Sequence, residues 1–213
     1  MSERVRGPGE LPNFGPPSTP RPAASIVLLR RGGKHSQRAL EVLLLQRTKE
    51  AKFMPGLWVF PGGSVDPADG EGDAGYKACA LRELAEEATI ELAAEEELVP
   101  FCRWITPEVV STRFDAWFYL ALAPAHTPPQ PDGIEMIAAA WYTPAAALAA
   151  HKAGELPIAF PTRNQLESLL PFRSSDEAIA AHRDRTVEPI LPKILGSGED
   201  PRVVLPGDPE YPA

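Results

Sequence analysis

The chain has 213 residues, of which 44% are hydrophobic, and this favours one globular domain with short extensions or at most two small domains. Its formal net charge of −8 argues against general nucleic-acid binding, which needs a basic surface. A small anionic substrate is not excluded, because bound cations can supply positive charge locally. No stretch approaches the ~18 apolar residues that cross a membrane, so we expect no membrane partner.

The two cysteines, Cys79 and Cys102, do not form a C-x-x-C pair, and two cysteines do not make a disulfide framework. We therefore expect two reduced thiols in a cytoplasmic protein. The N-terminal segment from Met1 to Pro22 has no apolar core of the kind that signal peptides carry.

The same N-terminal segment contains six prolines between Pro8 and Pro22 and predicts a disordered arm over residues 1–22. The domain proper is expected over residues 23–186. It opens with two apolar strands, Ser25–Leu29 and Leu40–Gln46, which form a hairpin around a turn at Gly32-Gly33-Lys34. A third strand, Leu57–Phe60, runs into Pro61-Gly62-Gly63, and a loop rich in Asp and Gly follows from Ser64 to Gly75.

A helix is predicted over Tyr76–Ala88, with Asp73 as its N-cap. Strands then follow at Leu98–Ile105, Arg113–Leu122 and Met136–Tyr142. Thr143 caps a helix that begins at Pro144 and ends near Lys152, and two more helices are expected at Arg163–Leu170 and Ser175–Arg183. The remaining tail, residues 187–213, is rich in Pro and Gly and is expected to pack on the domain surface.

On the helix Tyr76–Ala88, Glu83, Glu86 and Glu87 stand at positions i, i+3 and i+4, so their carboxylates share one face. The opposite face is expected to be buried and consists of Ala78, Leu81, Ala85 and Ala88. Like charges at this spacing repel each other. Arg82 or bound divalent cations can offset that repulsion, whereas the alternative is a solvated acidic surface. The Pro-Gly-Gly turn upstream, where exposed backbone can approach a ligand, favours a binding site.

The run from Arg82 to Ile90, R-E-L-A-E-E-A-T-I, resembles the end of the Nudix box, G-x5-E-x7-R-E-U-x-E-E-x-G-U with U aliphatic, with Gly63 as its first glycine. The resemblance implies an α+β fold, an α/β/α sandwich around a mixed β-sheet. It also implies metal-dependent hydrolysis of a diphosphate X–P–O–P–Y with Mg²⁺ or Mn²⁺. In this scheme Glu86 and Glu87 bind the metal, Glu83 is a ligand or the general base, Arg82 orients a glutamate, and the Gly62-Gly63 backbone supplies a carbonyl.

Two positions depart from the box. Eighteen residues separate Gly63 from Arg82 where the pattern has 13, so the position of the first glutamate falls on Ala74. Nearby acids that can replace it remain open as alternatives: Asp66, Asp69, Glu71 and Asp73. Thr89 stands where the box has a glycine, and a β-branched residue adopts the left-handed conformation only at a cost of ~1–2 kcal/mol. We therefore expect the helix to end differently from the family pattern.

The segment from Leu44 to Gly63 is similar to a motif of Nudix coenzyme A diphosphatases, roughly L-L-T-x-R-S-x3-R-x3-G-x3-F-P-G-G. This implies a coenzyme A or acyl-CoA substrate, with Gly62 in contact with it. Arg47 and Lys52, and less strongly Lys49, would bind its phosphates. The alternatives are a solvated basic loop, a Nudix diphosphatase for ADP-ribose or a nucleotide sugar, and an inactive binding module. The complete set of Arg82 and its three glutamates argues against the inactive module.

Two further acids are open. Asp115 lies within an apolar strand and must either pair with Arg103 or Arg113 or line the site. Glu135 precedes the last strand, where the Nudix resemblance allows an acid that acts as base or ligand. The four histidines form no metal-binding spacing and are expected to be structural. The sequence leaves the oligomeric state open, with a homodimer as one alternative.

Overall fold

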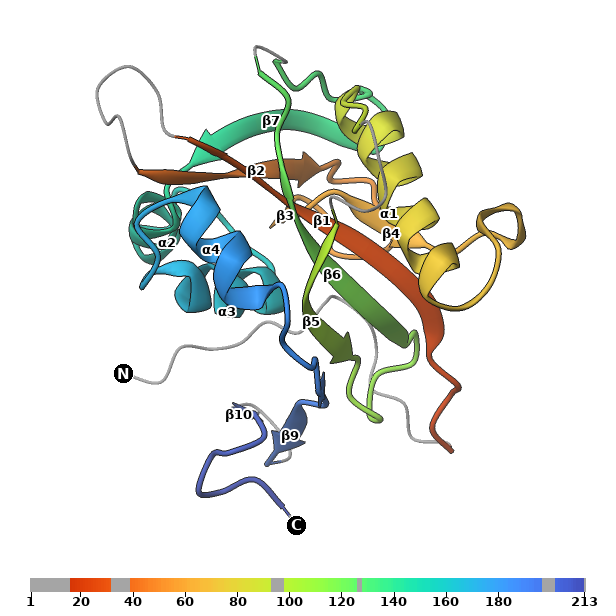
Figure 1. Cartoon of the computed structure of the whole chain (residues 1–213). Coiled ribbons are helices and arrows are strands. Elements are labelled where there is room, and N and C mark those ends of the chain that lie inside the picture. Colours follow the sequence, from red (N-terminus) through yellow and green to blue (C-terminus); the bar gives the residue numbers. More distant parts are fainter. Residues whose placement is uncertain (1–15, 32–38, 93–97, 126–127, 197–201, 213) are drawn as a thin grey trace.

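The computed structural model describes residues 16–31, 39–92, 98–125, 128–196 and 202–212. It is an α/β/α sandwich, with one helix on one face of a central sheet and three helices on the other (Figure 1). The predicted α+β sandwich around a mixed sheet is confirmed. Its elements are, in chain order, β1 (Arg21–Arg31), β2 (Leu40–Arg47), β3 (Trp58–Val59), β4 (Gly62–Ser64), the 3-10 helix η1 (Pro67–Asp69), α1 (Gly72–Ala88), β5 (Val99–Ile105), β6 (Phe114–Leu122), β7 (Met136–Tyr142), α2 (Pro144–Lys152), α3 (Phe160–Leu169), α4 (Ser175–His182), β8 (Pro189–Ile190), β9 (Lys193–Leu195) and β10 (Arg202–Val204).

The sheet has the strand order β3-β2-β1-β6-β5-β8, with β4 beside β1 and β7 beside β2. β1 runs parallel to β6, and β5 runs parallel to β8, while the other pairs are antiparallel. The predicted hairpin of the first two strands is therefore confirmed, although its turn at Gly32-Gly33-Lys34 lies outside the described residues. β4 pairs with the first half of β1, where Ala24 opposes Gly63, and this places the glycine turn next to the middle of the sheet.

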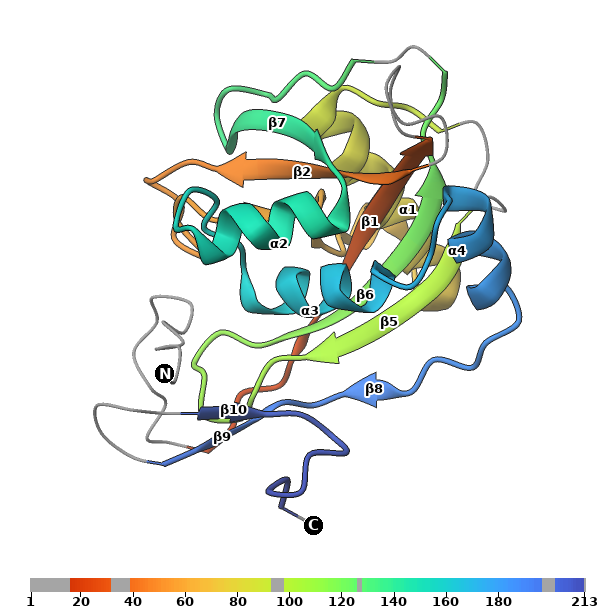
Figure 2. The ribbon, with the colours of Figure 1, turned by 90° about the vertical axis from the view of Figure 1, so that its left-hand side faces the viewer.

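The two faces of β1 build two cores, because successive side chains of a strand point to opposite sides. Ile26 and Leu28 pack against α1, where Leu84 is fully buried. Val27 and Leu29 point to the other face, which α2, α3 and α4 cover (Figure 2). This continuous apolar strand is what a sheet covered on both faces requires.

Several predicted boundaries are wrong by a few residues. β1 begins at Arg21, so the end of the predicted arm belongs to the sheet; residues 1–15 of that arm lie outside the described residues. The helix α1 begins at Gly72 and its N-cap is Glu71, not Asp73, so the helix is one turn longer than predicted. α3 begins at Phe160 instead of Arg163, because Pro161 fits the first turn of a helix.

The predicted buried face of α1 is confirmed at Ala88 and wrong at its other three residues. The residues that the helix buries are Gly75, Cys79, Ala80, Leu84, Glu87 and Ala88, whereas Ala78, Leu81 and Ala85 are only half-buried. The prediction placed the three glutamates together on the face opposite the buried one. Leu84 packs on β1 instead, and this rotation of the helix carries Glu87 into the interior while Glu86 stays exposed.

Thr89 ends α1 in the left-handed conformation, with φ 55° and ψ 40°, so the expectation of a different exit is wrong. The amide of Thr89 donates to the carbonyl of Ala85, as a left-handed cap does. Its hydroxyl donates to the carbonyl of Gln130 at 3.1 Å, and the Gln130 amide donates to the carbonyl of Ala88. These two bonds to another loop offset the strain of a β-branched residue in this conformation.

The C-terminal tail forms three short strands. β8 pairs in parallel with β5, where Ile190 opposes Trp104, and β9 and β10 form a separate two-stranded sheet beyond it (Figure 2). Val204 is buried. No helix in the described part of the chain is long and apolar enough to cross a membrane. Cys79 and Cys102 are both free thiols, which agrees with the expectation of no disulfide.

Candidate active site

The glycine turn of β4 brings the backbone into contact with α1. A Cβ atom at Gly62 would collide with Ser25 and with the carbonyl of Ala24 on β1. A Cβ atom at Gly63 would collide with the carboxylate of Glu83. Both positions therefore need glycine for close approach, and the second glycine leaves just enough room for an acid of the helix.

Glu87 is the most buried acid of the group, with 4% of its surface exposed. Its carboxylate accepts a hydrogen bond of 2.8 Å from the amide of Gly62, which fixes it against the turn. Burial raises the pKa of Glu87 to about 8, although the bond from Gly62 acts in the opposite direction. Burial also raises the pKa of Glu83, and the nearby Arg82 lowers it in part. The helix thus holds two carboxylates whose charge is incompletely compensated.

Arg82 connects three acids. Its Nε and Nη2 atoms donate to the two oxygens of Asp69 at 3.0 and 2.9 Å, and its Nη1 donates to Glu83 at 2.9 Å and to Glu86 at 3.1 Å. The hydrogen bond from Arg82 is the main reason that the pKa of Asp69 lies below its usual value. The Asp69 side chain is only 6% exposed, so its two hydrogen bonds with Arg82 are shielded from water on the Asp69 side. This two-pronged pair holds the guanidinium in one orientation.

Of the acids left open for the first box position, the structure brings only Asp69 to Arg82. Asp66 caps η1, Asp73 pairs with Lys77, and Glu71 is exposed at the N-cap of α1. Asp69 is six positions after Gly63, which is the spacing G-x5-E of the box. The five extra residues therefore lie between Asp69 and Arg82, and counting forward from Gly63 instead of backward from Arg82 would have identified it.

Cys79 lies one turn before Glu83 and its thiol donates to the carbonyl of Gly63 at 3.5 Å. Burial raises the pKa of the thiol to about 12. The group is therefore a neutral donor at physiological pH and not a nucleophile.

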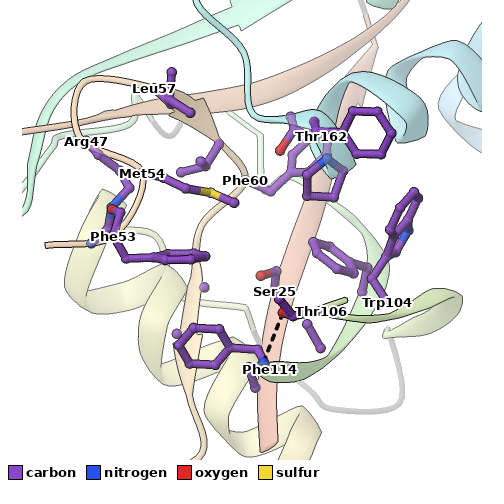
Figure 3. Close-up of a pocket in the computed structure, with 18 of the residues that line it drawn as sticks. Ser25, Arg47, Phe53, Met54, Leu57, Phe60, Trp104, Thr106, Phe114 and Thr162 are labelled. Atoms are coloured by element: carbon purple, nitrogen blue, oxygen red, sulfur yellow. Dashed lines mark hydrogen bonds between the residues drawn. The ribbon is translucent and has the colours of Figure 1, made fainter. Parts of the chain in front are cut away.

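One cavity of about 840 Å³ joins the acids to a large apolar chamber. Glu83, Glu86 and Glu87 line it together with Gly62 and Gly63. The chamber lies on the side of the sheet that α3 covers, and Figure 3 shows Phe53, Met54, Phe60, Trp104 and Phe114 around it. The ring of Phe53 meets that of Phe114 edge to face at 5.2 Å, and Trp104 meets Phe160 in the same way at 6.1 Å.

The three basic residues of the coenzyme A diphosphatase motif differ in whether they line the cavity. Arg47 lines the cavity close to Phe53 (Figure 3), to whose carbonyl its Nε donates at 3.0 Å. Its Nη2 lies 3.7 Å from Glu135. Lys49 and Lys52 are exposed on the loop between β2 and β3 and do not line the cavity.

Asp115 and Glu135, the two acids whose roles the sequence left open, lie in different surroundings. Asp115 binds Arg103 through two hydrogen bonds of 2.7 and 2.6 Å and does not line the cavity, so it takes the pairing alternative. Glu135 lines the cavity, and its negative charge contributes to the raised pKa values of Glu83 and Glu87. His151, which no sequence motif marks, lines the cavity as well and accepts a hydrogen bond from the amide of Ile158.

A hard divalent cation suits these donors by their chemistry, because carboxylate and carbonyl oxygens are the ligands that Mg²⁺ and Mn²⁺ prefer. Burial raises the pKa of Glu83 and of Glu87 more than Arg82 and Arg47 lower it, so a bound cation would stabilise the ionised forms of both carboxylates. Among the described residues, no three Asp, Glu, His or Cys side chains already surround one point. In this conformation Glu83 and Glu86 turn toward Arg82 instead.

The comparisons with known proteins agree with this geometry. The family model described as the NUDIX domain matches residues 19–160. A nudix hydrolase of Caenorhabditis elegans is 44% identical over 70 residues, which are 33% of this chain and 22% of the relative. The Acyl-coenzyme A diphosphatase NUDT19 of Gallus gallus is 25% identical over an alignment of 303 residues that covers 90% of this chain and 80% of the relative.

Solved structures share the fold. A NUDIX hydrolase from Alicyclobacillus acidocaldarius is 27% identical with a TM-score of 0.67, over 76% of this chain and 96% of its own. The NUDIX domain of Shewanella oneidensis NrtR, solved with ADP ribose, is 22% identical with a TM-score of 0.52, over 72% and 90%, and shows the fold alone. The chain belongs to the NUDIX domain family and is a Nudix hydrolase, an enzyme that cleaves a diphosphate linkage.

Proposed function

We propose that this hydrolase cleaves the diphosphate of coenzyme A or an acyl-CoA with the help of Mg²⁺ or Mn²⁺. The observation that carries the proposal is the single cavity that joins the acids of α1 to an apolar chamber, with Arg47 on its wall. Such a cavity suits a substrate with a diphosphate in the middle and a long, weakly polar arm on one side. The printed name of the chicken relative, an acyl-coenzyme A diphosphatase, supports the same substrate class.

In the proposed reaction Glu86 and Glu87 would hold the cation, together with the carbonyl of Gly63. A bound divalent ion lowers the pKa of water and neutralises charge that develops on phosphate. Glu83 would be a further ligand or the general base that accepts the proton of the attacking water. A pKa raised by burial brings a carboxylate closer to the pH at which a base is effective.

Arg82 is proposed to position these carboxylates, because it holds Glu83 and Glu86 while Asp69 fixes its own orientation. Arg47 would bind a phosphate oxygen from the cavity wall. Gly62 would lie against the substrate, where its lack of a side chain allows a close approach. Lys52 is exposed near Phe53, which lines the cavity, and is proposed to meet the separate 3′-phosphate of coenzyme A.

A substrate with two polar ends, such as ADP-ribose or a nucleotide sugar, would leave the apolar chamber without a matching group. The solved complex of the NrtR domain with ADP ribose makes this the main competing substrate class. We keep the cytoplasm as the proposed location because both cysteines are free thiols. A homodimer remains an alternative to a monomer.

An activity screen with Mg²⁺ and with Mn²⁺ tests the proposal directly. The substrates are coenzyme A, octanoyl-CoA, ADP-ribose, NADH and a nucleotide sugar, and the products are identified by mass spectrometry. We expect 3′-phosphoadenosine 5′-phosphate and 4′-phosphopantetheine or its acyl form. Rapid cleavage of ADP-ribose without cleavage of any coenzyme A species would refute the substrate assignment and leave the general hydrolase activity.

A further inference from the structure

The apolar chamber extends beyond the part of the chain that matches the family. The family model ends at residue 160, yet the cavity is also lined by the start of α3 and by three residues of the C-terminal tail. These tail residues are Pro192, Ile194 and Val203. The wall of the chamber therefore includes residues beyond the part of the chain that the family model matches.

The geometry of the tail explains why these residues face the cavity. Ile194 on β9 and Val203 on β10 are direct cross-strand partners, so their side chains share one face of the hairpin. Their neighbours Lys193 and Leu195 point to the other face. Lys193 lies on that side over the ring of Tyr211 and donates to the carbonyl of Pro212 at 3.0 Å.

The hairpin is attached to the main sheet through its first strand. β8 leads into it from the edge of the main sheet, where Ile190 pairs with Trp104, itself a cavity residue. On β10, Val204 is buried, and Arg202 forms an exposed ion pair of 2.9 Å with Glu210 within the tail itself. The side chains of Ile194 and Val203 therefore project from a hairpin that β8 links to the main sheet.

The chemistry of this part of the wall is aliphatic. Ile194, Val203 and Pro192 from the tail join Pro107 and Val110 from the loop between β5 and β6. None of these side chains donates or accepts a hydrogen bond, so this wall suits an alkyl chain better than a purine base, whose ring atoms need polar partners. A cavity of about 840 Å³ lies in the upper part of the ~300–1,000 Å³ range of ligand pockets.

We infer that the β9–β10 hairpin forms the outer wall of a subsite for the acyl chain, so that this part of the tail determines how strongly acyl-CoAs are preferred to free coenzyme A. Ile194 and Val203 are its specificity-determining residues. The inference rests on the proposed function and names the substrate class within it. Each buried methylene contributes about 0.8 kcal/mol, which is a factor of about four in affinity. An octanoyl chain should therefore raise kcat/KM well above that for free coenzyme A.

The test compares kcat/KM for free, butyryl-, octanoyl- and dodecanoyl-coenzyme A. We expect octanoyl-CoA to exceed free coenzyme A by at least tenfold in the wild type. Ile194→Trp and Val203→Trp fill the subsite and should lower this ratio at least fivefold. Leu195→Trp is the matched control, because Leu195 is the next residue of β9 on the opposite face and does not line the cavity; it should keep the ratio. Ile194→Ser, a smaller change, should lower the ratio as well.

Calorimetry with octanoyl-CoA in the presence of a chelator gives a second readout, and the dissociation constant should follow the same order among the variants. A wild-type ratio near one, with coenzyme A still cleaved, would overturn the subsite and leave the proposed function intact. A high ratio that Ile194 and Val203 variants leave unchanged would remove the hairpin from acyl recognition. Failure to cleave any coenzyme A species would reject the proposed function and the inference together.

Discussion

Asp69 and Arg82 form a two-pronged ion pair, in which the Nε and Nη2 atoms of Arg82 lie 3.0 and 2.9 Å from the two oxygens of Asp69. The pair connects η1 to α1, and the five extra residues of the box lie between its two partners. Because the remaining donor of the fork, Nη1, contacts both Glu83 and Glu86, the orientation of Arg82 decides where these carboxylates lie.

We predict that Asp69→Asn lowers kcat by at least tenfold while the melting temperature changes by only a few degrees. An amide keeps the shape of the side chain but replaces one acceptor with a donor, which repels a guanidinium N–H. Arg82 would then lose its fixed orientation and no longer position Glu83. Steady-state kinetics and thermal unfolding measure the two quantities.

Asp73→Asn is the matched control, since Asp73 lies in the first turn of α1 and there pairs with Lys77 and accepts a hydrogen bond from Tyr119 instead of binding Arg82. We expect its turnover to stay within twofold of the wild type. Equal losses in both variants would mean that Asp69 has no special role in the site.

The sequence predicts the layout of this fold well because the strands are long apolar runs and the glutamates stand at helical spacing. It fails at Glu87, where helical periodicity cannot say which of several similar rotations the helix adopts; the packing of Leu84 on β1 decides that. It fails at Thr89 because the hydroxyl contact to Gln130 comes from a loop 41 residues away. The tail residues Ile194 and Val203 carry no local pattern that links them to a cavity, since only the tertiary fold brings them there.

We predict that Glu86→Gln or Glu87→Gln lowers Mg²⁺-dependent turnover at least a hundredfold while the fold is retained. The amide matches the carboxylate in shape but removes the charge that a divalent cation requires. Circular dichroism checks the fold, and turnover is measured over a range of Mg²⁺ concentrations. Glu91→Gln, an exposed acid just after α1, is the control and should keep full activity. Near-normal turnover in either Glu86→Gln or Glu87→Gln would show that the cation is bound elsewhere.

The metal-free protein should lose stability as the pH rises. The pKa of Glu87 is about 8 in the folded state against 4.5 normally, mainly because the group is buried. Between these values the folded protein retains a proton that the unfolded chain has released, so the free energy of unfolding falls as the pH rises from about 4.5 to about 8. The full effect is on the order of a few kcal/mol.

Thermal unfolding in a chelator, at about pH 5.5 and about pH 8.5, measures this dependence for the wild type and for Glu87→Gln. The wild type should lose several degrees more than the variant, since 1 kcal/mol corresponds to roughly 2–4 °C for a chain of this size. Added Mg²⁺ should reduce the loss in the wild type only. Parallel curves for both proteins in chelator would show that Glu87 titrates normally.

Two N-terminal deletions should differ in stability. Arg113 is buried, and its Nη1 donates to the carbonyl of Ser18 at 2.7 Å, while the Ser18 hydroxyl donates to the carbonyl of Ser111. Removal of residues 1–20 leaves a guanidinium donor without this partner, which costs about 1–3 kcal/mol. Removal of residues 1–15 keeps the contact, and the composition of that segment offers little to bury. We therefore expect a melting temperature several degrees lower for the longer deletion only.

The last prediction concerns the 3′-phosphate of coenzyme A. Lys52 is exposed on the loop before Phe53, a cavity residue whose carbonyl also holds Arg47. A long, flexible side chain at this place can reach a phosphate at the cavity mouth without lining the cavity itself. Reversal of its charge replaces an attraction with a repulsion, so Lys52→Glu should raise KM for coenzyme A several-fold. Dephospho-coenzyme A lacks the 3′-phosphate, and its KM should change much less.

Lys152→Glu controls for the change in net charge, because Lys152 is an exposed lysine at the end of α2; it should change the KM of both substrates equally little. The ratio of the two KM values is the measurement, because it cancels any general effect on folding or on the diphosphate site. If Lys52→Glu changes both KM values by the same factor, Lys52 does not recognise the 3′-phosphate.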